Sequence, residues 1–152
     1  MDLARITAAH VDGRTQNARY RQAQFHRLQS TLIEHIAEIQ DAIRADSGHT
    51  QEETRAEVVL AMQELRTHYS SLDIHKDLEI EYRVAQGKDN AENVQGAGIV
   101  YIVPSTHTLF YSVISALTAA VAAGNCVVLE VRIPTTPKRL AERVDMSLNA
   151  KP

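Results

Sequence analysis

Apolar side chains recur every three or four residues between about Asn17 and Ala45. The members of this stripe are Phe25, Leu28, Leu32, Ile36, Ile39 and Ile43. Because that spacing puts them along one face of a helix, the pattern predicts a single long amphipathic helix. Asp46-Ser47-Gly48 follows the stripe, and glycine readily adopts the left-handed conformation that closes a helix. We expect the helix to end there.

A second apolar stripe begins shortly afterwards. Its members are Val58, Ala61, Met62, Leu65, Tyr69 and Leu72. Thr50 and Glu53 stand ahead of it at the spacing of a capping box, in which the two side chains bind backbone N–H groups at the start of a helix. A second helix should therefore begin here. Two such helices joined by a short loop favour an antiparallel pair.

The helical pattern weakens beyond Leu78, and residues 86–93 are polar and rich in turn formers. We interpret this stretch as a loop or connecting arm. Residues 98–103 (GIVYIV) then form a short β-branched run that is bounded by glycine and by Pro104. Such a run predicts a strand that is buried on both faces and ends at the proline.

Residues 109–123 predict a helix rich in small side chains. A turn at Gly124-Asn125 and a second buried strand at 126–129 (CVVL) follow it. The two strands and the helix between them form a βαβ unit, whose strands are parallel and whose ligands are expected at the carboxyl ends of the strands. Thr136-Pro137 then offers the start of a last helix.

These elements predict an α/β fold. An N-terminal helical pair precedes the start, βαβα, of a parallel Rossmann-like sheet. We expect two parts, namely the helices and connecting arm at 1–95 and a partial dinucleotide-binding segment at 96–152. In a sheet of two strands, both are edge strands with unpaired backbone groups. The sheet is therefore expected to be incomplete.

The composition narrows the class of protein. Of the 152 residues, 44% are hydrophobic and 23% are charged, and the formal net charge is −3. These values are typical of a folded globular chain and provide no basic field for nucleic acid. The longest apolar stretch, 109–129, is interrupted by polar residues and glycine, so we do not interpret it as a membrane span. A single cysteine and an N-terminus without the apolar region of a secretory signal favour the cytosol.

Three segments resemble the aldehyde dehydrogenase superfamily: residues 98–103, the loop around His107, and residues 122–129 (AAGNCVVL). In order and without gaps they are similar to the family's glycine and apolar strand, its catalytic-asparagine loop, and its AAGNxVVL helix end and strand. Upstream, Asp46-Ser47-Gly48 and Glu53 are similar to the break and the second helix that open the family's fold. The resemblance covers most of the chain. It implies the N-terminal portion of an NAD(P)-dependent oxidoreductase that acts on aldehydes.

The resemblance implies two site positions, and both depart from the family. His107 stands where the family has an asparagine whose amide helps to bind the developing oxyanion, and an imidazole can also donate one hydrogen bond. Glu130 stands where the family commonly has a lysine that contacts the adenosine ribose or its phosphate. A carboxylate there repels a 2′-phosphate but can accept from ribose hydroxyls. NAD is thus the possible cofactor, and NADP is disfavoured.

The family's general-base glutamate and nucleophilic cysteine lie beyond the segments that match. Covalent catalysis on an aldehyde needs an activated thiol with a base in reach, whereas Cys126 falls in a predicted buried strand. We therefore expect a truncated, aldehyde-dehydrogenase-like protein without independent activity. An alternative is a binding or assembly module that docks on itself or on a full-length relative. A remnant site for NAD is a third possibility.

The remaining polar residues indicate no further site. His68 and His75 lie seven residues apart with no third ligand at metal spacing, so no metal site is expected. Gly124 and Asn125 are assigned the structural role of a tight turn. One group of carboxylates is interpreted as solvated charge on helix faces. Its members are Glu52, Glu53, Glu57, Asp77, Glu79 and Glu81.

Overall fold

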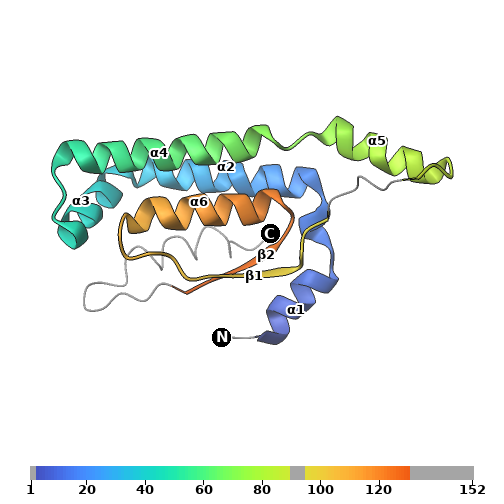
Figure 1. Ribbon diagram of the computed structural model, residues 1–152, viewed down its shortest axis with the longest axis horizontal. Helices are drawn as coiled ribbons and strands as arrows, with labels where there is room; N and C mark the ends of the chain where they lie inside the picture. The colour runs from blue at the N-terminus through green and yellow to red at the C-terminus, as the bar shows by residue number, and fades with distance from the viewer. Residues whose placement is uncertain (1–2, 90–94, 131–152) are drawn as a thin grey trace.

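The structure is a computed structural model that describes residues 3–89 and 95–130. Its elements are α1 (Leu3–Val11), the 3₁₀ helix η1 (Arg14–Gln16), α2 (Ala18–Glu34), α3 (Ile36–Ser47), α4 (Gln51–Ser70), α5 (Ile74–Ala85), β1 (Ile99–Ile102), α6 (Leu109–Ala122) and β2 (Cys126–Leu129). The described part is mostly helical, with two short parallel strands that form a small sheet (Figure 1). The α/β character predicted from the sequence is confirmed. The last helix, predicted from Thr136, lies outside the described residues.

Helix α6 lies between the sheet and a layer of helices. Figure 1 shows α4 and α2 along one side of α6 and the two strands along the other, and α6 contacts all four elements. The strands pair in parallel, from Ile99 opposite Cys126 to Ile102 opposite Leu129. The predicted strand–helix–strand order is thus confirmed, with α6 as the connection between neighbouring parallel strands.

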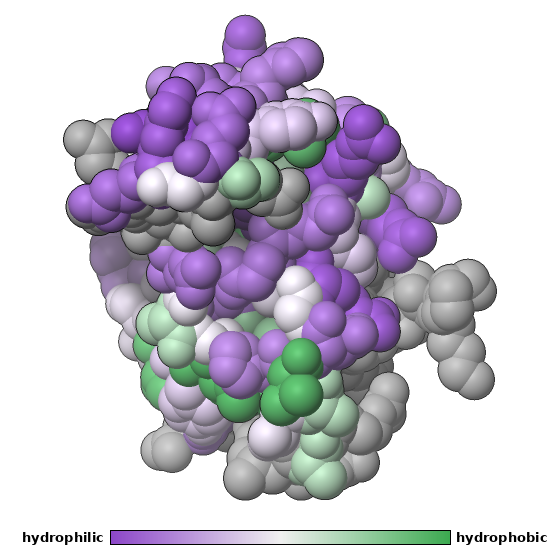
Figure 2. All heavy atoms as spheres, turned by 90° about the vertical axis from the view of Figure 1, so that its right-hand side faces the viewer, coloured by the Kyte–Doolittle hydropathy of each residue, from purple (hydrophilic) through white to green (hydrophobic). Residues whose placement is uncertain are grey.

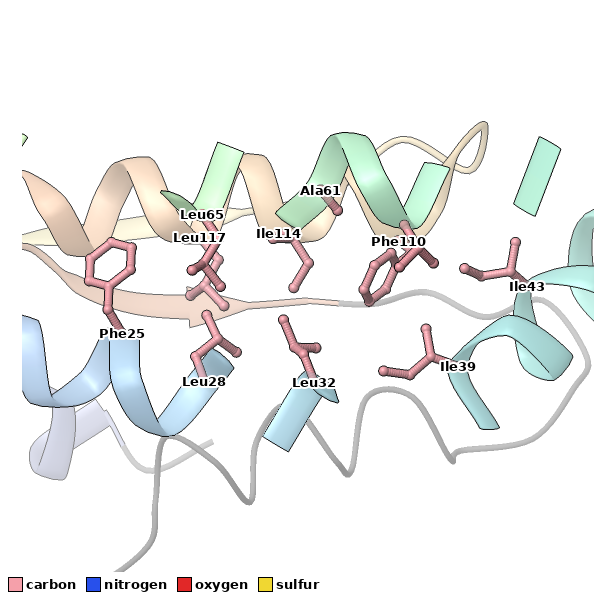
Figure 3. Close-up of a cluster of buried hydrophobic side chains, with 11 residues drawn as sticks. Phe25, Leu28, Leu32, Ile39, Ile43, Ala61, Leu65, Phe110, Ile114 and Leu117 are labelled. Atoms are coloured by element: carbon pink, nitrogen blue, oxygen red, sulfur yellow. The ribbon is translucent and has the colours of Figure 1, made fainter. Parts of the chain in front are cut away.

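The core forms where α2, α3, α4 and α6 meet, and their apolar side chains point toward one another (Figure 3). Its buried members are Phe25, Leu28, Leu32, Ile39, Ile43, Val58, Ala61, Leu65, Phe110, Ile114 and Leu117. Ile114 and Leu117 are fully buried, so α6 is the centre of this cluster. Both predicted stripes supply the core, because a face with a period of three to four residues can be buried only against a neighbouring surface.

The single helix predicted from Asn17 to Ala45 is wrong, because it is two helices. Its backbone leaves the helical conformation at His35, where φ is −104° and ψ is 17°. Ile36, the stripe residue directly after the break, is 39% exposed, whereas Leu32 and Ile39 on either side are buried. The break therefore removes one member of the stripe from the core. Helix α3 ends at Gly48 in the left-handed conformation, as predicted.

Helix α4 begins with the predicted capping box. The Thr50 hydroxyl accepts a hydrogen bond from the Glu53 N–H group, and the Glu53 carboxylate accepts one from the Thr50 N–H group. The chain then forms a further helix, α5, which the sequence analysis did not predict. The Asp73 carboxylate accepts hydrogen bonds from the N–H groups of His75 and Lys76, and this arrangement favours the start of a helix.

Strand β1 is not buried on both faces. Ile99, Tyr101 and Val103 are 43%, 52% and 56% exposed, whereas Ile102 is buried. Successive side chains of a strand point to opposite faces, so the face of β1 that carries Ile99 and Tyr101 is only partly covered, although α1 contacts both strands. The prediction was wrong because a β-branched run shows a strand without showing what covers it. Seen from the α5 end, the surface is hydrophilic above, and apolar side chains gather below at the level of α1 (Figure 2).

Candidate functional site

The carboxyl ends of the two strands bring the predicted site positions to one edge of the sheet. Ile102 pairs with Leu129, and the N–H group of Glu130 donates a hydrogen bond to the Ile102 carbonyl over 2.9 Å. The loop that carries His107 leaves β1 at this edge. The sheet thus gives His107 and Glu130 a common edge, as expected for the carboxyl ends of parallel strands. Their predicted roles toward an aldehyde and a cofactor remain predictions.

The loop that precedes α6 is held by short-range hydrogen bonds. The Ser105 hydroxyl oxygen accepts from the His107 N–H group over 3.1 Å, and the Ser105 N–H group donates to the Ser112 hydroxyl, also over 3.1 Å. Thr108 adopts the left-handed conformation with φ at 49°, which is unfavourable for a β-branched residue. Such strained positions persist where surrounding contacts fix the backbone. The imidazole of His107 is exposed on this loop.

Glu57, which lies on the neighbouring helix α4, caps the start of α6. Its Oε1 atom accepts a hydrogen bond from the Tyr111 N–H group over 3.1 Å, whereas Thr108, the residue before the helix, provides no side-chain cap. The Glu57 side chain is only 4% exposed, so the interpretation of this residue as solvated charge was wrong. A carboxylate here satisfies one free N–H group and lies at the positive end of the helix dipole.

The stripe of α4 contains the signal that would have placed Glu57 in the core. Thr54, Glu57, Ala61 and Leu65 succeed one another at three or four residues, and all four are buried. Glu57 was interpreted as solvated because its side chain is charged. Among residues 3–89 and 95–130, the buried hydroxyl of Thr54 and the buried Oε2 atom of Glu57 have no hydrogen-bond partner.

One imidazole lies beside this carboxylate, and a second imidazole lies against the first. The Nδ1 atom of His49 is 3.8 Å from the Glu57 Oε2 atom, and the rings of His49 and His107 meet edge to face with their centroids 6.5 Å apart. We call His49, Glu57 and His107 the α6 entry cluster. Sequence reasoning missed His49, because it stands in the loop between α3 and α4, far along the chain from its two partners. The cluster places a negative charge where a helix start would otherwise attract a phosphate.

Cys126 is buried in β2, as predicted. Its N–H group donates to the Gly98 carbonyl over 2.8 Å, and the residue is 9% exposed. A thiol in such a setting is usually an inert packing group. Within residues 3–89 and 95–130, no group of three or more histidine, cysteine, aspartate or glutamate residues is arranged to hold a metal ion. No helix in the same ranges is long and apolar enough to cross a membrane.

Comparisons with known proteins agree with the resemblance read from the sequence. The sequence model described as "Aldehyde dehydrogenase family" matches residues 4–142. The mouse (Mus musculus) protein "Aldehyde dehydrogenase family 3 member B1" is 27% identical over 150 residues, which cover 93% of this chain. The chain spans 30% of the length of that relative. No solved structure gives a significant match.

Proposed function

The chain belongs to the aldehyde dehydrogenase family, and on that basis we propose that its 152 residues form the N-terminal portion of the family's fold and do not oxidise aldehydes by themselves. The observation that carries the proposal is the setting of Cys126, the single cysteine of the sequence, within the small sheet. A family match over residues 4–142 supports the fold, and the buried thiol supports the lack of turnover.

The chemistry of aldehyde oxidation explains why turnover depends on the accessibility of the thiol. A thiolate must reach the carbonyl carbon of the substrate, and a base must lie close enough to activate the thiol and later a water molecule. Cys126 is buried at the first residue of β2, with its backbone N–H group paired to the Gly98 carbonyl. It therefore presents no nucleophile to a substrate at the edge of the sheet.

We infer that the carboxyl edge of the sheet corresponds to the family's cofactor and substrate site, with His107 and Glu130 in place of the family's residues. On the family resemblance, His107 would donate a hydrogen bond to a developing oxyanion, and Glu130 would accept from the ribose hydroxyls of NAD. The same carboxylate would repel the 2′-phosphate of NADP. Calorimetry with both cofactors tests this part. We expect NADP to bind no more tightly than NAD, and Glu130→Lys to change that order in favour of NADP.

Turnover is tested directly with the purified chain. NAD or NADP is added with short aliphatic and aromatic aldehydes, and cofactor reduction is followed by absorbance. We expect the rate of the wild-type chain to equal that of Cys126→Ala. Reduction by the wild-type chain above this control would overturn the proposal, because it would show that Cys126 or a group dependent on it reacts.

A second proposal is that the chain acts as an assembly module, which docks on another copy or on a full-length relative. The partly covered face of β1 supports it, since Ile99 and Tyr101 on the strand and Val103 directly after it expose alternating apolar side chains. Tyr101→Lys is expected to weaken such association, and Leu60→Lys, an equally exposed site on α4, is the control. A well-folded monomer over a wide range of concentration in sedimentation experiments would contradict this function.

A further inference from the structure

The α6 entry cluster links three segments that are far apart in the sequence. Glu57 contributes one oxygen to the start of α6 and directs the other toward His49, whose ring meets that of His107. The side chain of Glu57 is 4% exposed and that of His49 is 24% exposed. In the part of the chain that the structure describes, the Oε2 atom of Glu57 has no hydrogen-bond partner, and a buried carboxylate oxygen in that state attracts the nearest group that can donate a hydrogen bond.

We propose that Glu57 is a positioning residue for His107, acting both through the start of α6 and through the ring of His49. The inference rests on the proposed function in one respect, because His107 has a role there only as the residue at the family's oxyanion position. The arrangement itself is independent of any reaction. It makes helix α4 the element that orients the loop at the edge of the sheet.

The two oxygens of Glu57 have separate tasks. Oε1 holds the Tyr111 N–H group, which fixes the first turn of α6 and hence the end of the loop that carries His107. Oε2 faces Nδ1 of His49, and this favours the tautomer of His49 that bears a proton on Nδ1. A fixed tautomer and ring plane of His49 hold the surface against which the His107 ring packs in one orientation.

Glu57→Gln separates these tasks. A glutamine can keep the hydrogen bond from Tyr111 through its oxygen, and its NH₂ group then faces His49. A donor in that place favours a His49 ring with an unprotonated Nδ1 atom. The variant should therefore preserve the fold and the start of α6 while it reverses the tautomer of His49.

The experiment is nitrogen NMR of histidine-labelled chain above the titration range of imidazole, without cofactor or aldehyde. His49→Asn and His107→Asn identify the two rings among the seven histidines. For the wild-type chain we expect the Nδ1-protonated tautomer at His49 and a nuclear Overhauser effect between the two rings. In Glu57→Gln we expect loss of that tautomer and a shift of the His107 ring signals, with the backbone amide signals of α6 retained.

A matched control uses the more exposed pair on the same helix, in which His68 Nε2 lies 3.5 Å from Glu64 Oε2. Glu64→Gln should leave the signals of both cluster rings unchanged. The proposal is overturned if Glu57→Gln moves the His49 and His107 signals no more than Glu64→Gln does. It is also overturned if His49→Ala leaves the His107 ring unaffected. Aldehyde oxidation by the chain would contradict the proposed function alone and leave this result intact.

Discussion

The side chain of Asn125 joins the start of one strand to the end of the helix before the next. Its Oδ1 atom accepts a hydrogen bond from the Gly98 N–H group over 2.9 Å, and its Nδ2 atom donates to the Ala120 carbonyl over 3.2 Å. Asn125 is buried, and the glycine before it turns the chain with φ at 83°. The asparagine of the AAGN segment therefore has a structural role here, since its amide satisfies two buried backbone groups.

Asn125→Ala is expected to lower the free energy of unfolding by about 1–3 kcal/mol, because it leaves the buried N–H group of Gly98 without a partner. Urea denaturation followed by circular dichroism measures the loss. Gln29→Ala, an exposed site on α2, is the control and should change stability by less than about 0.5 kcal/mol. Equal effects of the two substitutions would show that the Asn125 amide does not stabilise the turn.

The unit β1–α6–β2 could be predicted from the sequence because its signals are local. An apolar run, a helical period and a Gly-Asn turn each fix the conformation of a few neighbouring residues. The break at His35 could not be predicted, because neither proline nor glycine marks it. The sequence signal for helix α5 is a single residue, Asp73, whose carboxylate accepts hydrogen bonds from the N–H groups at the start of the helix.

One part of the candidate site could likewise be predicted from the sequence, and another part could not. The position of His107 and Glu130 at the carboxyl edge follows from the order of strand and helix, which the sequence shows. The burial of Glu57 does not follow from its charge, because the group that stabilises its carboxylate is the N–H group of Tyr111, 54 residues further along the chain. Contacts of this range arise only when α4 packs on α6. The spacing of Glu57 within the stripe of α4 does place it on the buried face, but it does not show which group the carboxylate binds.

Arg21 clamps three segments to α2, and its replacement should destabilise the chain. Its guanidinium donates to the carbonyls of Ala122 and Gln16 and pairs with Asp77 on α5 over 3.0 Å. The arginine side chain is 14% exposed. Arg21→Ala is expected to cost about 1.5–3 kcal/mol, because charge-assisted bonds to two carbonyls are lost, of which the one to Ala122 is partly buried. Urea denaturation measures this value.

Asp77→Asn tests how much of the stability contributed by Arg21 comes from the ion pair and how much from the carbonyl contacts. The Asp77 side chain is 44% exposed, so the ion pair contributes at most about 1 kcal/mol after solvent screening. Hydrogen exchange should become faster in α5 and remain unchanged in α6. If Asp77→Asn costs as much as Arg21→Ala, the carbonyl contacts are not what Arg21 contributes.

Two buried threonines provide a matched pair for the value of a buried hydroxyl. Thr54 and Thr118 are each 1% exposed and lie on helices. The Thr118 hydroxyl donates to the Ile114 carbonyl over 2.7 Å, whereas the Thr54 hydroxyl has no partner among the described residues. Replacing an unpaired hydroxyl by a methyl group removes a desolvation cost. Thr54→Val should therefore be neutral or stabilising, whereas Thr118→Val should cost about 1 kcal/mol. Thermal unfolding of both variants decides, and the reverse order would contradict the assignment of Thr54 as unpaired.

The capping box of α4 should make stability depend on pH in the acidic range. The pKa of Glu53 is lowered below its ordinary value, first by the hydrogen bond from the Thr50 N–H group, then by the Thr50 hydroxyl and by the charge of His49. A carboxyl group whose pKa is lower in the folded than in the unfolded state stabilises the fold above its unfolded pKa. That contribution is lost as the pH falls through the folded pKa.

Glu53→Gln removes the titration while glutamine keeps the geometry of a capping box. At neutral pH the wild-type chain should be more stable than Glu53→Gln, and the difference should shrink as the pH falls below the ordinary pKa of a glutamate. Urea midpoints over this pH range measure it. Glu52→Gln, an exposed neighbour, corrects for the general effect of removing one negative charge. A difference between the wild-type chain and Glu53→Gln that stays constant with pH would show that the Glu53 carboxylate does not act through its charge.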